Sequence, residues 1–176
     1  MSSSPVILYR YDASPYARKI DNVLALKNVP HNKVNVSSML PRPEITDLLG
    51  ITYRRIPILA IGNDVYCDTS LIVSVLERRF PTSAGYSTIF PRSKRGGSRD
   101  TGATKIFSKL FVAALFPFAT AFIAWEKLPQ AFIQDRSALF GTPIDVSQVV
   151  ATREKSITTV SAYLVRYMDF LKSFYY

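Results

Sequence analysis

The order of strand-like and helix-like segments in the first half of the chain restricts its fold more than any other sequence feature. Short β-rich runs bounded by turn residues occur at Val6–Tyr11, Lys33–Val36, Ile56–Ile61 and Val65–Cys67. A helical pattern separates the first two runs, so we expect them to form a parallel pair with a right-handed crossover. Residues 62–64 (Gly-Asn-Asp) form a tight hairpin turn, so the last two strands must be antiparallel.

Three helical patterns complete this arrangement. One follows Ser14-Pro15 and ends near Asn28, the second covers Pro43–Leu49, and the third follows Asp68-Thr69-Ser70 and ends before Pro81. The resulting order is strand, helix, strand, helix, strand, strand, helix. This order predicts a thioredoxin-like α/β domain, and the residues from 6 to 81 are about the right number for it.

The second half of the chain has a different organisation. Residues 82–102 are rich in Ser, Gly, Arg and Thr, which predicts a linker. Only helical patterns follow it, at Ile106–Trp125, Lys127–Leu139 and Val149–Lys172. We therefore expect a thioredoxin-like domain over residues 1–81 and an all-α region over residues 103–176.

The segment Leu110–Trp125 is apolar enough to raise the question of a membrane span. Its 16 residues carry no charge, but Pro117 lies inside it, and Lys109 and Glu126 flank it. A membrane-spanning helix needs about 20 apolar residues, so we expect a buried helix here. Attachment to a membrane through residues 106–125 stays as an alternative.

The composition argues against several classes of function. The formal net charge is +9, but basic residues cluster only at Arg92–Arg99, without interleaved aromatic residues. We interpret this cluster as a solvated linker and expect no nucleic-acid partner. One cysteine, Cys67, and one histidine, His31, allow neither an internal disulfide nor a His/Cys metal site. We therefore expect no metal. The N-terminus lacks the pattern of a signal peptide, so we expect a cytoplasmic protein.

Three motifs in the first domain resemble those of the cytosolic glutathione transferases. They are ASPYARK at 13–19, YRRIPIL at 53–59 and YCDTSLI at 66–72, and their order and spacing match the family's glutathione-binding domain. The Ser-Pro-aromatic form of the first motif is similar to the serine-using classes. Residues 125–145 (WEKLPQAFIQDRSALFGTPID) resemble the first part of the family's helical domain, most of all in fungal and bacterial members.

In the family this helical domain continues for several more helices. The resemblance therefore implies an incomplete all-α domain, truncated at its C-terminal end. Fewer partners are then available for the apolar faces of Ile106–Trp125 and Val149–Leu171, which predicts a large exposed apolar patch. A homodimer or another protein partner could cover this face.

Ser14 is the catalytic candidate that the resemblance implies. By itself, Ser14 followed by Pro15 predicts only a helix start, with serine as the N-cap and proline at the first helical position. In the family, a hydroxyl at this place donates a hydrogen bond to the thiolate of glutathione, which is the co-substrate. Lowering a thiol pKa by about two units takes about 2.7 kcal/mol, which one charge-assisted hydrogen bond and a helix dipole can supply. A thiol-transfer reaction would need a cysteine at this position, and the sequence has none.

Two pairs of neighbouring residues are candidates for binding glutathione. The resemblance implies a cis bond before Pro57, which would leave the backbone of Ile56 free to pair with glutathione as an added strand. It also implies that Thr69 binds the γ-glutamyl carboxylate at a helix N-terminus and that Asp68 binds the γ-glutamyl amino group. Without the resemblance, Pro57 could simply begin a strand, and Asp68-Thr69 could simply cap a helix.

Three arginines are candidates for the glycyl carboxylate of glutathione. Arg55 is the main candidate, because the family often has a basic residue before the cis-proline dipeptide. Arg54 and Arg42 are weaker candidates, and solvated surface charge is the alternative for all three.

These observations lead to two main hypotheses of function. The first is a detoxifying glutathione transferase that conjugates the glutathione thiolate to small hydrophobic electrophiles. An apolar acceptor pocket could then be lined by aromatic side chains, although phenylalanine at helical spacing is more often part of a core: Tyr16, Phe111, Phe116, Phe118 and Trp125. The second hypothesis is a non-catalytic binding or interaction protein that keeps the thioredoxin-like scaffold.

Overall fold

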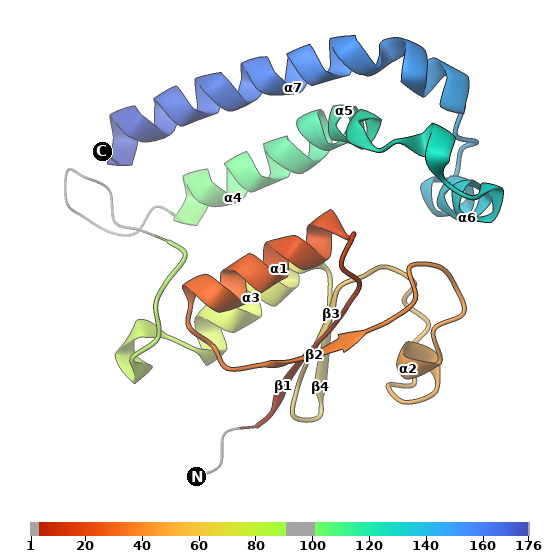
Figure 1. Ribbon diagram of the computed structural model, residues 1–176. Helices are drawn as coiled ribbons and strands as arrows, with labels where there is room; N and C mark the ends of the chain where they lie inside the picture. Colours follow the sequence, from red (N-terminus) through yellow and green to blue (C-terminus); the bar gives the residue numbers. More distant parts are fainter. Residues whose placement is uncertain (1–3, 91–100, 176) are drawn as a thin grey trace. The chain divides into compact units, whose positions relative to one another are not determined.

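The computed structural model describes residues 4–90 and 101–175 of the chain. These residues form two compact units, Met1–Ile89 and Phe90–Tyr176 (Figure 1). The expected boundary after residue 81 falls inside the first unit, because a turn of 3₁₀ helix at Thr82–Ala84 and the segment up to Ile89 belong to it. The middle of the expected linker, residues 91–100, lies outside the described residues.

The first unit is built on a four-stranded sheet with the order β2-β1-β3-β4. The strands are β1 (Val6–Arg10), β2 (Asn32–Asn35), β3 (Ile58–Ile61) and β4 (Asp64–Cys67). β1 and β2 are parallel, whereas β1–β3 and β3–β4 are antiparallel. The expected parallel pair and hairpin are therefore confirmed, as is the thioredoxin-like fold.

Two helices cover one face of this sheet (Figure 1). They are α1 (Pro15–Leu26) and α3 (Thr69–Arg79), which pack against each other. Alternate strand residues, such as Leu8 and Leu59, point toward Ile20 and Ile72 on these helices, and all four are fully buried. The neighbouring strand residues, such as Tyr9 and Ile58, belong to a second cluster on the other face together with Ile45 of the short helix α2 (Pro43–Thr46). This division follows from the two-residue period of strands.

Two of the expected elements are shorter than the sequence pattern suggested. The strand expected from Ile56 begins at Ile58, because proline has no N–H to give to the sheet and ends the ladder at Pro57. The helix expected over Pro43–Leu49 ends at Thr46, and the chain then turns toward Gly50, whose φ of +66° suits glycine.

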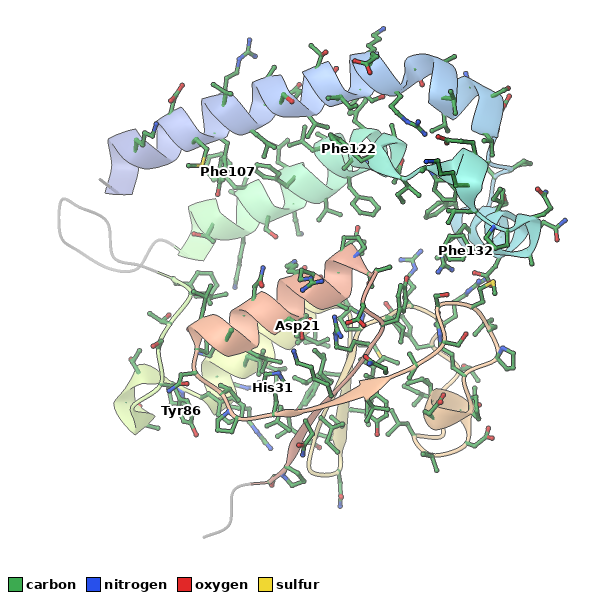
Figure 2. All side chains as sticks on the ribbon, viewed as in Figure 1. Asp21, His31, Tyr86, Phe107, Phe122 and Phe132 are labelled. Atoms are coloured by element: carbon green, nitrogen blue, oxygen red, sulfur yellow. The ribbon has the colours of Figure 1, made fainter. Side chains whose placement is uncertain are left out.

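Charged side chains reach into the interior of the first unit. Asp21 of α1, labelled in Figure 2, pairs with Arg10 of β1 at 3.0 Å and with Lys33 of β2 at 2.9 Å. Lys27 is completely buried, and its Nζ contacts Glu77 Oε1 at 2.8 Å. These ion pairs link α1 to the sheet and to α3.

The second unit contains only helical segments. They are α4 (Thr101–Leu110), a π-helical segment (Phe111–Leu115), α5 (Phe116–Ala119), two 3₁₀ turns (Thr120–Phe122 and Trp125–Lys127), α6 (Gln130–Phe140) and α7 (Val146–Tyr175). The single helix expected over Ile106–Trp125 is thus interrupted. Proline lacks an N–H for the regular ladder, and Pro117 lies two residues after the last residue of the π-helical segment.

Arg153 of α7 holds the irregular end of this segment. Its guanidinium donates to the backbone oxygens of Ala121 at 3.0 Å and Ile123 at 3.2 Å. It also forms a two-pronged ion pair with Glu126, at 2.9 and 2.7 Å. Arg153 therefore supplies donors to carbonyl groups near the point where the regular helix ends.

The helical run Thr104–Phe122 is long and apolar enough to cross a membrane by length and composition, with 19 residues and a mean hydropathy of 1.5. Only 11% of this stretch is buried inside the structure. The expectation of a buried helix over Leu110–Trp125 is therefore wrong for most of its length: Leu110 and Phe122 are each 53% exposed, whereas Leu115 is buried. Such a helix is weak evidence for a membrane span, because soluble proteins also contain helices of this kind.

Candidate functional site

The three turns that carry the sequence motifs lie at one end of the sheet in the first unit. Tyr9 near the end of β1 pairs with Ile58 at the start of β3, and Ile58 pairs with Cys67 at the end of β4. The chain therefore leaves β1 toward Ser14, enters β3 through Pro57 and leaves β4 toward α3 at the same end of the sheet. Segments about 40 residues apart in the sequence are brought together by this register.

Ser14 is the N-cap of α1. Its Oγ accepts a hydrogen bond from the Ala17 backbone N–H at 3.2 Å, and Pro15 occupies the first helical position. The side chain is only 3% exposed. Among the described residues, no hydrogen bond uses the Ser14 hydroxyl as the donor, so its proton remains available to an acceptor.

The peptide bond between Ile56 and Pro57 is cis, as the resemblance implied. Both residues are buried, and Ile56 packs with Ala17 and Ile58 in one apolar cluster. Within the described part of the chain, the backbone of Ile56 forms no hydrogen bond. Backbone groups of this kind can pair with an extended peptide.

Asp68 and Thr69 form the start of α3. Asp68 Oδ1 accepts hydrogen bonds from the N–H groups of Ser70 at 2.8 Å and Leu71 at 3.3 Å, so the capping function is present. Asp68 adopts φ 75° and ψ 128°, a region that is almost exclusive to glycine and costs a few kcal/mol. Its second carboxylate oxygen has no hydrogen bond to a described residue. A strained residue at a helix start is typical of a functional position.

Charged and phenolic groups from all three turns influence one another. Burial raises the pKa of Tyr16, which follows Pro15, while Arg55 lowers it and Asp68 raises it. Burial also raises the pKa of Tyr53, which feels the same Arg55 and Asp68 and, in addition, Cys67. The charges of Arg55 and Asp68 thus act on both tyrosines.

Lys19 is a member of this site that the sequence analysis did not identify. Its Nζ donates a hydrogen bond to Thr69 Oγ1 at 3.2 Å, which joins the second turn of α1 to the start of α3. Burial lowers the pKa of Lys19, and Asp68 partly opposes this effect. Lys19 is the last residue of the ASPYARK motif, so the motif itself was the available signal. Tyr53, the first residue of YRRIPIL, was missed in the same way.

The three arginine candidates have different surroundings. Arg42 is 4% exposed and donates to the backbone oxygens of Ser37 at 2.7 Å, Ser38 at 2.9 Å and Arg54. Its guanidinium therefore holds a loop, which favours a structural role for Arg42 over the binding of a ligand carboxylate. Arg54 is half-buried and Arg55 is exposed.

The aromatic side chains suggested for an acceptor pocket are divided between the two units. Tyr16 is in the first unit, whereas Phe111, Phe116, Phe118 and Trp125 are in the second. Trp125 is 2% exposed, and its indole N–H donates to the Thr120 oxygen at 2.9 Å, so it is a core residue of the second unit.

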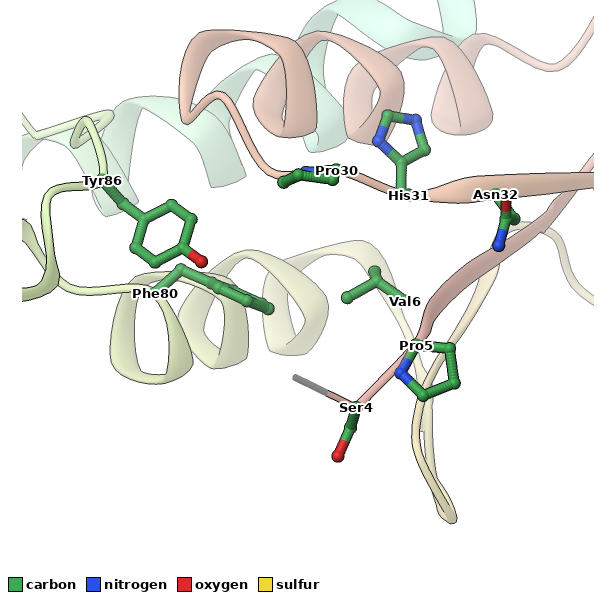
Figure 3. Close-up of a pocket in the computed structure, with 8 residues that line it drawn as sticks. All are labelled: Ser4, Pro5, Val6, Pro30, His31, Asn32, Phe80 and Tyr86. Atoms are coloured by element: carbon green, nitrogen blue, oxygen red, sulfur yellow. The ribbon is translucent and has the colours of Figure 1, made fainter. Parts of the chain in front are cut away.

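One pocket, of about 320 Å³, lies away from these turns (Figure 3). Its lining includes Val6 at the start of β1, His31 before β2, and the edge-to-face pair Phe80–Tyr86. It is therefore at the opposite end of β1 from Ser14. Among the described residues, no cluster of three or more His, Cys, Asp or Glu side chains could hold a metal ion.

Comparisons with known proteins agree with this geometry. Residues 8–84 match the family described as "Glutathione S-transferase, N-terminal domain". This match includes all three turns. No curated protein matches the sequence.

Solved structures of glutathione transferases resemble nearly the whole chain. A GST-like protein from Pseudomonas syringae is 25% identical, with a TM-score of 0.57 over 93% of this chain and 50% of that one. A glutathione S-transferase from Methylobacillus flagellatus with glutathione bound is 24% identical, with a TM-score of 0.54 over 95% and 70% of the two chains. The Tau class enzyme from mango is 13% identical, with a TM-score of 0.63 over 97% and 64%.

The chain thus spans only part of the length of these solved structures. It covers 50% of the protein from Pseudomonas syringae and 64% of the enzyme from mango. The matched segment, residues 8–84, contains the sheet, the cis bond before Pro57 and the start of α3. Through this segment, the chain is similar to the N-terminal domain of glutathione S-transferases.

Proposed function

We propose that this protein binds glutathione at the end of the sheet formed by the turns at Ser14, Ile56 and Asp68, and that it is a serine-type glutathione transferase. The observation that supports this most strongly is the register β1–β3–β4, which brings the three turns together inside the segment that matches the family. A bound glutathione would contact each turn with a different part of the tripeptide.

In this proposal the Ser14 hydroxyl donates its proton in a hydrogen bond to the glutathione sulfur. The Ala17 N–H donates to Ser14 Oγ and fixes the position of this oxygen, so the hydroxyl proton can point toward the sulfur. The N-terminus of α1 adds a positive partial charge beside the sulfur. Together they favour thiolate over thiol, and the thiolate attacks a small hydrophobic electrophile.

The other contacts follow from the chemistry of each group. The free backbone N–H and C=O of Ile56 pair with the cysteinyl residue of glutathione, and Pro57 fixes the shape of this turn. Thr69 receives the γ-glutamyl carboxylate, and the free oxygen of Asp68 receives the γ-glutamyl ammonium group. Arg55, which is exposed near Tyr53, receives the glycyl carboxylate.

The location, role and assembly of the protein are part of the same proposal. A thioredoxin-like fold is consistent with a soluble protein, and we place it in the cytoplasm with a role in detoxification. Large apolar side chains are exposed on the second unit, including Val165 at 61% and Met168 at 52%. A second copy of the chain or another protein would cover them.

The same exposed side chains favour a second candidate function, a non-catalytic interaction protein that keeps the glutathione transferase scaffold. The two candidates differ in whether glutathione is activated. Retention on immobilised glutathione tests binding, and conjugation of 1-chloro-2,4-dinitrobenzene, in which the sulfur displaces chloride, tests activation.

We expect the wild type to be retained and to form the conjugate, and Ser14→Ala to conjugate roughly 10- to 100-fold more slowly, because about two pKa units of thiolate stabilisation are at stake. Binding without turnover would favour the interaction protein. Neither binding nor turnover would contradict the glutathione proposal as a whole.

A further inference from the structure

Lys19 differs from the other charged side chains that reach into the first unit. Lys27 is paired with Glu77, and Arg10 and Lys33 are paired with Asp21. Within the described residues, Lys19 forms no ion pair, and the partner recorded for its Nζ is the neutral Thr69 hydroxyl at 3.2 Å. Burial lowers the pKa of Lys19, because the ammonium group loses part of its hydration and the protein groups around it do not fully compensate for this loss.

The place to which Lys19 reaches makes this more unusual. Thr69 is the first residue of α3, where the helix dipole carries a positive partial charge. A lysine at this end is repelled by the dipole, whereas an anion would be attracted by both. The backbone N–H of Thr69 has no hydrogen-bond partner among the described residues. The hydroxyl proton of Thr69 is also free to donate, because its oxygen accepts from Lys19.

We infer that Lys19 is a further ligand-binding residue, whose ammonium group pairs with the α-carboxylate of the γ-glutamyl group of glutathione. The inference rests on the proposed function and adds to it a cation to which the sequence analysis assigned no role. Lys19 Nζ, the Thr69 N–H and the Thr69 hydroxyl then present three donors to one carboxylate. Asp68, on the other side of Thr69, keeps its free oxygen for the neighbouring ammonium group of the same γ-glutamyl residue.

This arrangement makes the site selective for a thiol peptide that carries both a carboxylate and an ammonium group at its γ-glutamyl end. A peptide that lacks only this carboxylate is 4-aminobutanoyl-cysteinyl-glycine, which keeps the ammonium group, the thiol and the glycyl carboxylate. It is the matched ligand for testing Lys19, because any contact other than the one with the carboxylate is available to both peptides.

The test measures the dissociation constants of glutathione and of this analogue by isothermal titration calorimetry, for the wild type and for Lys19→Gln. Arg18→Gln serves as the control, because Arg18 is the exposed neighbour of Lys19 on α1 and its loss changes the net charge equally. We expect Lys19→Gln to weaken glutathione binding by roughly 10- to 100-fold, the range of a hydrogen bond between charged groups. The analogue should bind the wild type and Lys19→Gln equally, within about twofold, and Arg18→Gln should leave both constants unchanged.

Two results would overturn the inference. Equal weakening of both peptides by Lys19→Gln would mean that Lys19 acts through the fold, and unchanged glutathione binding would mean that it does not contact the carboxylate. Failure of the wild type to bind glutathione would instead remove the proposed function itself. A measurement on the wild type supports the comparison: the Lys19 side-chain NMR signals should shift on adding glutathione and stay in place on adding the analogue.

Discussion

Lys27, the C-cap residue of α1, and Glu77 of α3 form an ion pair of 2.8 Å whose ammonium group is fully buried. The same ammonium group donates to the backbone oxygens of Phe80 at 3.0 Å and Ser87 at 2.8 Å. Glu77 in turn accepts from the Thr88 hydroxyl at 2.8 Å and the Ile89 N–H at 3.1 Å. This ion pair therefore connects the end of α1, helix α3 and the segment that follows α3.

Replacing Lys27 by Met should destabilise the first unit by about 2–4 kcal/mol, because Glu77 and two carbonyl groups lose a buried donor. Urea unfolding monitored by circular dichroism measures this change. Lys33→Met is the matched control, because Lys33 is also paired with a carboxylate but its side chain is 46% exposed. We expect a loss below about 1 kcal/mol there, and equal losses in the two variants would contradict the prediction.

The same pair predicts a dependence of stability on pH. Burial raises the pKa of Glu77, but the hydrogen bonds from Lys27, Ile89 and Thr88 outweigh this effect and hold the pKa below its ordinary value of 4.5. Since the pKa is lower in the folded state than in the unfolded state, the contribution of Glu77 is complete above about pH 4.5 and is lost as the pH falls further. Urea midpoints measured from pH 7 to pH 3 should fall more steeply for the wild type than for Glu77→Gln. Parallel profiles would show that Glu77 does not contribute to the dependence.

Loss of Arg55 should affect glutathione binding, whereas loss of Arg42 should affect the stability of the fold. Arg55→Ala should weaken glutathione binding by roughly 10-fold, through a lost charge-assisted hydrogen bond, with little change in stability. Arg42→Ala should lower stability by about 2–3 kcal/mol, because three backbone oxygens lose their donor. Calorimetric titration and thermal unfolding of both variants check this, with the exposed Arg78→Ala as the control. Weaker binding without a loss of stability in Arg42→Ala would return Arg42 to the ligand site.

The fold of the first unit could be predicted because its signals are local. Alternating apolar residues set the two faces of the strands, Ser14 and Asp68 are cap residues directly before helices, and residues 62–64 are a hairpin turn. The cap residues Ser14 and Asp68 are also members of the proposed glutathione site, so the sequence pattern that predicted the helix starts also indicated the site. The cis bond before Pro57 came from the resemblance to the family, because a proline alone does not specify its isomer.

What could not be predicted depends on residues that are distant in the sequence. Lys19 meets Thr69 across 50 positions, and Arg42 meets the Arg54 oxygen across 12. A charged side chain looks the same in the sequence whether it faces solvent, a carbonyl group or a ligand. In the second unit, the apolar run Leu110–Trp125 indicated a buried helix, but burial depends on which elements pack there, and Leu110 and Phe122 are exposed.

Arg153 and Glu126 give a prediction for the second unit, where the two-pronged ion pair joins α7 to the irregular segment before α6. The hydrogen bonds from Arg153 lower the pKa of Glu126 to about 2. The contribution of this pair should therefore persist in acid and be lost only as the pH falls from about 4.5 toward 2. Arg153→Met should lower the melting temperature at pH 7, whereas Arg166→Met, which removes a charge elsewhere on α7, should not. Equal melting temperatures for wild type and Arg153→Met would show that the segment does not depend on this side chain.

Ser14 has two separable functions, and three substitutions can distinguish them. The oxygen accepts the Ala17 N–H, which stabilises the start of α1, and the proton is proposed to be donated to the glutathione sulfur. Ser14→Thr keeps both functions, Ser14→Asp keeps the acceptor but has no proton to give at neutral pH, and Ser14→Ala loses both. Ser14→Ala should therefore cost about 1 kcal/mol of stability, whereas Ser14→Asp should cost little.

Activity should follow a different order from stability. The pKa of the bound thiol, measured from thiolate absorbance against pH, should be lowest in the wild type and Ser14→Thr. It should rise by about one to two units in Ser14→Ala, and further in Ser14→Asp, whose carboxylate repels the thiolate. The carboxylate of Ser14→Asp raises the thiol pKa by repulsion alone, so this variant tests the cap through stability, and Ser14→Thr and Ser14→Ala test the proton. A thiol pKa that is raised in Ser14→Ala and unchanged in Ser14→Thr would assign the hydroxyl proton to the sulfur, whereas equal pKa values in Ser14→Ala and the wild type would contradict this role.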